Sequence, residues 1–108
     1  MTTAHDTRYA YEKFSEAIGI MATSELPLRQ RLLEARTCFV AVDADDMPAE
    51  ARADFVALDT RMSSVKASRG EGDWAATLAA VSDDEVRRLA RLLVDIFWRL
   101  EDAVRGGV

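Results

Sequence analysis

Apolar side chains recur at steps of three and four residues in four stretches of this 108-residue chain. The four stretches cover residues 11–21, 28–42, 51–65 and 86–103. Such spacing places the apolar residues of each stretch on one side of an α-helix. The chain is therefore predicted to form helices whose apolar sides pack against one another, and no strand-like alternation competes with this pattern.

Capping residues and turn formers mark where these helices should begin and end. Thr23 or Ser24 is expected to cap the second long helix, and Asp46 the third. Ser82 and Glu85 form the capping-box sequence S-x-x-E ahead of the last one. The expected helices, with these caps included, cover residues 7–22, 23–42, 46–66, 74–80 and 82–105.

Short connections between successive helices favour antiparallel neighbours. We therefore predict an all-α fold, an up-down four-helix bundle with a short extra helix before the long C-terminal helix. Residues 1–108 are expected to form a single helical domain in which residues 1–6 are disordered.

Charge and cysteine content narrow the classes of partner and compartment. The 14 Lys and Arg residues against 19 Asp and Glu residues give a net charge of −5, which disfavours nucleic acid and anionic membranes as partners. The longest apolar run, residues 92–98, contains Asp95 and is too short to span a membrane. Cys38 is the single cysteine, and no secretory signal pattern is present, so we expect a cytoplasmic protein. Abundant arginine and alanine are typical of a bacterial or phage chain.

The residue types that carry catalysis or bind metals are sparse. His5 is the single histidine and lies near the amino terminus, so no second histidine can share a metal ion with it. Cys38 lies beside an apolar stripe and is expected to be a small buried hydrophobe. The acidic segment 43–48 lacks the glycine and the distant glutamate of a calcium loop. We therefore predict no catalytic residues, no metal site and no cofactor.

Helical enzymes of this size were weighed as an alternative. Di-iron bundles need Glu-x-x-His pairs, and the sequence contains none. Glu12 and Glu16 could offer two magnesium ligands, but Glu34 is unpaired on the second long helix. A non-enzymatic protein is the prediction, and a metal-dependent helical hydrolase or small-molecule-binding bundle is the alternative.

Several apolar residues lie off the main stripes. Apolar positions of the last helix cover about 200° of its circumference, and Trp98 lies outside them among charged residues such as Arg91 and Asp95. The predicted protein interface combines such residues with neighbouring ones on the same helices and comprises Trp98, Arg91, Phe97, Leu33, Val40, Tyr9, Ile20 and Trp74.

Two interpretations of this extra apolar surface remain open. In one, the short helix with Trp74 covers the extra faces within a single chain. In the other, another chain buries them, because contiguous exposed apolar area marks interaction sites and Trp and Arg are favoured at their centres. The leading hypothesis is protein binding, as a homodimer, an accessory subunit or an inhibitor of a larger complex.

Overall fold

The computed structural model describes residues 7–106, which contain five α-helices, one short 3-10 helix and no strand. The predictions for His5 and for disorder in residues 1–6 lie outside this range. The elements are α1 (Thr7–Thr23), α2 (Leu28–Phe39), the 3-10 helix η1 (Ala44–Asp46), α3 (Ala49–Met62), α4 (Asp73–Ala80) and α5 (Asp83–Gly106).

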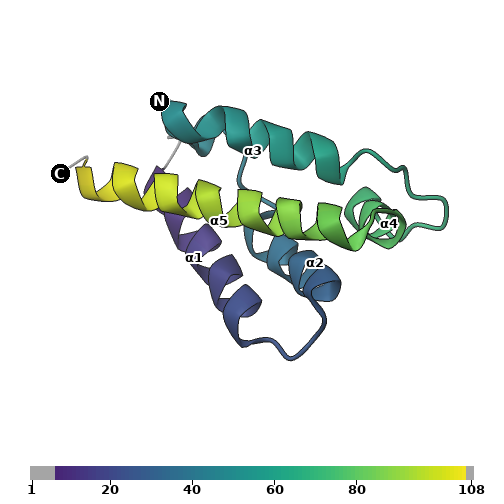
Figure 1. Cartoon of the computed structure of the whole chain (residues 1–108). Helices are drawn as coiled ribbons and strands as arrows, with labels where there is room; N and C mark the ends of the chain where they lie inside the picture. The colour runs from purple at the N-terminus through teal and green to yellow at the C-terminus, as the bar shows by residue number, and fades with distance from the viewer. Residues whose placement is uncertain (1–6, 107–108) are drawn as a thin grey trace.

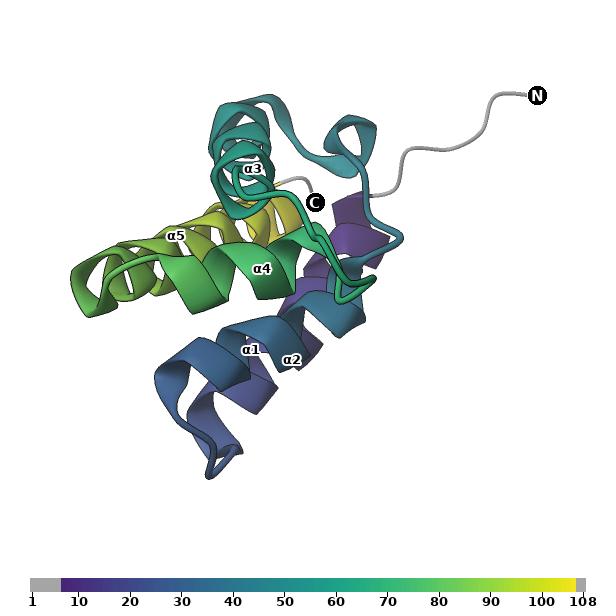
Figure 2. The same cartoon turned by 90° about the vertical axis from the view of Figure 1, so that its right-hand side faces the viewer.

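Two antiparallel helix pairs cross each other at a steep angle (Figure 1). α1 packs along α2, while α3 runs antiparallel to α5, and α5 also contacts α1 and α2. The short α4 contacts both α2 and α3 at the end of the molecule that lies to the right in Figure 1 and faces the viewer in Figure 2. The all-α prediction is confirmed. The up-down four-helix arrangement is not confirmed, because the successive helices α2 and α3 diverge instead of packing along each other.

One side of each helix supplies the core. The Phe14 ring of α1 lies 4.4 Å from the Phe39 ring of α2 and 6.1 Å from the Phe55 ring of α3, measured between centroids. Burial of each such side chain contributes about 1.5–3 kcal/mol. The buried residues of α5, the longest helix, follow the predicted stripe and are Val86, Leu89, Leu93, Ile96 and Leu100.

The start of α2 differs from the prediction because a proline precedes it. The Pro27 carbonyl accepts hydrogen bonds from the backbone N–H groups of Gln30 and Arg31, and α2 begins at residue 28. Thr23 is still part of α1, and the Ser24 hydroxyl bonds to the Leu26 N–H and to Glu34 instead. The predicted cap at Thr23 or Ser24 is therefore wrong.

The third helix is also shorter than predicted at both ends. Asp46 does not cap it, because the side chains of Asp43 and Asp46 form a capping box around η1. Pro48 precedes α3, which ends at Met62, four residues before the predicted end. At the last helix, the predicted Ser82 cap is confirmed, since the Ser82 hydroxyl accepts the Glu85 N–H at 3.1 Å.

Membrane crossing was tested on the helices themselves. In the described part of the chain, no helix combines the length and the apolar character that a lipid bilayer requires.

Candidate functional site

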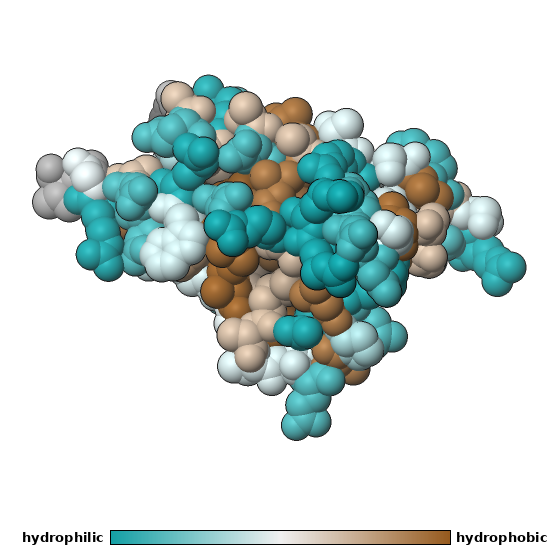
Figure 3. All heavy atoms as spheres, in the orientation of Figure 1, coloured by the Kyte–Doolittle hydropathy of each residue, from teal (hydrophilic) through white to brown (hydrophobic). Residues whose placement is uncertain are grey.

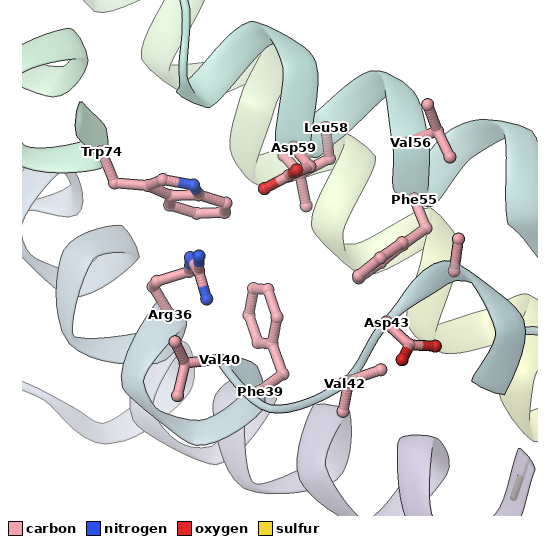
Figure 4. A pocket seen from close by; sticks show the side chains of 11 residues that line it. Arg36, Phe39, Val40, Val42, Asp43, Phe55, Val56, Leu58, Asp59 and Trp74 are labelled. Atoms are coloured by element: carbon pink, nitrogen blue, oxygen red, sulfur yellow. The ribbon is translucent and has the colours of Figure 1, made fainter. Parts of the chain in front are cut away.

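A cavity of about 250 Å³ opens where α2 and α3 diverge (Figure 4). α2 supplies one wall, α3 the opposite wall, and α4 closes one end. Its volume is just below the range of pockets for drug-sized ligands, so it suits one side chain or one compact group. The lining residues are Arg36, Phe39, Val40, Val42, Asp43, Ala44, Phe55, Val56, Leu58, Asp59 and Trp74.

Helical spacing explains why these side chains meet. Arg36 lies four residues before Val40, the helical C-cap residue of α2, and Phe55 and Asp59 are four apart on α3, so each pair lies on one side of its helix. Trp74 in the first turn of α4 meets the Phe39 ring edge to face, with 5.8 Å between ring centroids. The cavity therefore has aromatic walls held by the core itself.

Arg36 is the cation of this cavity. Its guanidinium carbon lies 4.6 Å from the centroid of the Trp74 ring and 5.9 Å from that of Phe39. Burial lowers the pKa of the Arg36 guanidinium, and the negative charge of Asp59 offsets part of that effect. Figure 4 shows Asp59 extending from α3 toward the space that Arg36 and Trp74 border from the other side.

Two buried donors at this place have no hydrogen-bond partner among residues 7–106. They are the Nε atom of Arg36 and the Nε1 atom of Trp74. Trp74 as a whole is only 7% exposed. Buried polar groups are almost always hydrogen-bonded, and buried charges are paired. Two adjacent exceptions in a cavity wall indicate a site suited to a hydrogen-bond acceptor.

A second surface lies on the outer side of α5. Trp98 is 55% exposed, its ring lies 5.6 Å from that of Phe97, and Phe97 stacks on Tyr11 of α1 at 5.7 Å. Figure 3 shows apolar groups at the junction between α1 and α5, bordered by hydrophilic residues. We call Tyr11, Phe97 and Trp98 the aromatic row.

The eight interface residues predicted from the sequence are divided between these two surfaces and the rest of the molecule. Phe97 and Trp98 are in the aromatic row, and exposed Arg91 on the same helix pairs with Asp95 at 3.1 Å. Val40, 63% exposed, lies at the cavity, as does Trp74.

The other predicted interface residues lie elsewhere. Leu33 is exposed on the same side of α2 as Val40. Tyr9 and Ile20 on α1 are half-buried, and neither lines the cavity.

Sequence reasoning missed the polar residues of the cavity. The available signal for Arg36 was its position at the edge of the apolar stripe of the second long helix. It lies next to the core residue Ala35 and four residues before the apolar Val40. Asp59 gave no signal, because its position across from Arg36 depends on how α3 is placed.

Metal binding and thiol reactivity were the two kinds of chemistry that the sequence left to the structure. Among them, no three His, Cys, Asp or Glu side chains lie close enough together to hold a metal ion. Burial raises the pKa of the half-buried Cys38 thiol, and the charge of Glu16 raises it further, which opposes formation of a reactive thiolate.

Comparison with known proteins finds no matching family model, and no match among the curated proteins or the solved structures.

Proposed function

We propose that this protein is a non-enzymatic helical domain of the cytoplasm that acts by binding protein, with a second copy of the chain as the partner. The observation that carries the proposal is the exposed Trp98 at the end of the aromatic row. Because Trp98 is 55% exposed, its side chain leaves a large apolar area in water, and burial of that area by a partner is favourable.

The aromatic row has the features of a binding centre. Trp98 contacts Phe97, and Phe97 is fixed by its stacking on Tyr11, so the apolar area continues from α5 onto α1. Aromatic side chains lose little conformational entropy on binding, and tryptophan is enriched at the energetic centres of interfaces.

Charges of both signs surround Trp98, which favours a protein partner over nucleic acid. Arg91 lies seven residues before Trp98, and Asp102 lies four residues after it. Both are on the same side of α5 as Trp98. If two copies of α5 meet in antiparallel orientation, the Arg91 of one can face the Asp102 of the other. This self-complementarity supports a two-fold homodimer.

The alternative class, a small-molecule-binding bundle, is favoured by a different observation, the cavity between α2 and α3 with its unpartnered donors. The two functions are compatible, because the aromatic row and the cavity share no residue.

Sedimentation equilibrium of the wild type and two variants tests the homodimer. Trp98→Ala removes the exposed indole, and we expect it to weaken self-association about 30-fold, the effect of losing a 2 kcal/mol hot spot. The matched control is Leu26→Ala, which truncates another exposed apolar residue, located between α1 and α2. A wild type that stays monomeric at the highest soluble concentration, or a dimer that both variants weaken equally, would contradict the proposal.

A further inference from the structure

Arg36 has donors that the described residues do not satisfy. Among residues 7–106, its side chain forms no hydrogen bond and no ion pair. In contrast, Arg29, two helical turns earlier on the same side of α2, bonds to two backbone carbonyls and to Asp83. Arg29 thus ties α2 to the end of α4, while Arg36 contributes its guanidinium to the cavity wall. The contrast indicates that Arg36 is not needed as a structural link.

We propose that the cavity between α2, α3 and α4 is a binding site for a carboxylate attached to a compact apolar group. A carboxylate matches a guanidinium in charge and in planar, two-point geometry. Arg36 keeps its position for this role by lying over the Trp74 ring, at 4.6 Å from the ring centroid, so little side-chain freedom remains to be lost on binding.

The remaining walls select the apolar part of the ligand. Phe39 and Phe55 are core residues that also line the cavity, so the pocket is preformed. Val40 and Val56, exposed by 63% and 47%, add apolar surface on α2 and α3. A branched aliphatic group of four or five carbons fits a volume of about 250 Å³.

Asp59 tunes the affinity of this site. Its negative charge acts on Arg36 from the other side of the cavity, and no ion pair joins the two side chains. A bound carboxylate would be repelled by Asp59 while it pairs with Arg36. Removal of the Asp59 charge should therefore strengthen the binding of an anion and weaken the binding of a cation or a hydrogen-bond donor.

Indole N–H resonances in ¹H–¹⁵N NMR spectra test the proposal directly. Trp98→Phe leaves Trp74 as the single tryptophan, so one indole signal reports on the cavity. The probes are 4-methylpentanoate, N-acetyl-leucine and N-acetyl-leucinamide, the last of which differs from the second by having an amide in place of the carboxylate. We expect saturable shifts of the Trp74 signal with both acids, at least about tenfold tighter than with the amide.

Two variants identify the residues responsible. Arg36→Met should abolish the preference for acid over amide, and Asp59→Asn should tighten acid binding about threefold. Stronger binding of N-acetyl-leucine than of 4-methylpentanoate would assign the site to a polypeptide terminus, and the reverse to a free organic acid.

Equal binding of the acid and the amide, no saturable shift, or a preference that survives Arg36→Met would overturn the inference. None of these results depends on self-association through Trp98, which is measured separately.

Discussion

Replacement of Arg36 by methionine should make the protein more stable. Arg36 is a partly buried cation that forms no salt bridge within the described part of the chain, and its Nε donor is buried there without a partner. Methionine keeps an unbranched side chain in contact with Phe39 and Trp74, and it removes the unsatisfied donor and the desolvated charge.

The magnitude follows from three contributions. Relief of one buried unsatisfied donor is worth about 1–3 kcal/mol. Loss of the contact between the guanidinium and the Trp74 ring costs about 0.5–2 kcal/mol. Loss of the attraction by exposed Asp59 costs less than about 1 kcal/mol. The midpoints of these ranges leave a small net gain, and relief of the desolvated charge adds to it, so the expected change is a gain of about 0–1 kcal/mol, or at most about 4 °C in Tm for a domain of this size.

Urea denaturation followed by far-UV circular dichroism measures this change. Arg88→Met is the matched control, because Arg88 is exposed and pairs with Glu85 at 3.4 Å within the same helix. We expect the control to change the free energy of unfolding by less than about 0.5 kcal/mol. A loss of 1 kcal/mol or more in Arg36→Met would refute the reasoning, because it would show that Arg36 stabilises the fold.

Two further variants test a buried hydrogen bond and an ion pair outside the cavity. Thr77→Val should lower the free energy of unfolding by about 1–3 kcal/mol in urea denaturation, because the buried Thr77 hydroxyl accepts the Val65 N–H at 3.0 Å and the valine leaves that donor unsatisfied; an unchanged midpoint would contradict this. Glu85→Gln should be less stable than the wild type at neutral pH, because the Arg61 guanidinium, 2.6 Å from the carboxylate, lowers the pKa of Glu85. A lowered pKa stabilises the fold above the ordinary value of 4.5, so thermal melts should show the difference shrinking as pH falls through and below 4.5, and a difference that persists unchanged in acid would argue against the ion pair.

The helices were predictable because their signals are local. The apolar spacing of Val86, Leu89 and Leu93 gave α5 within about one residue at each end, and Ser82 capped it as predicted. Errors arose where a proline and a polar side chain compete for the same helix start. Pro27 and Pro48 each stand immediately before a helix, so side-chain caps placed further upstream do not contact the first free N–H groups.

The arrangement of the helices was harder to predict because it depends on the connection between α2 and α3. Residues 40–48 follow the end of α2 and contain η1, which is held by its own capping box and lies where the chain changes direction. Nothing in helical periodicity encodes that change of direction. The cavity is its direct consequence, since Arg36 and Asp59 face each other only when α2 and α3 diverge.

The aromatic row was partly predictable. Trp98 stood out among charged residues of its helix, and the structure places it on the exposed side of α5. Its extension onto α1 was not predictable from one helix, because the stacking of Phe97 on Tyr11 depends on how α1 crosses α5.

Pairing of two chains through the exposed side of α5 is the central claim, and the indole resonance of Trp98 tests it most directly. A concentration series of ¹H–¹⁵N spectra from about 10 µM to about 1 mM spans the dissociation constants expected of a weak homodimer. The account predicts that the Trp98 indole signal moves with concentration while the Trp74 signal stays in place. A Trp98 signal that is constant over the whole series, with Trp74 or no tryptophan responding, would contradict the account.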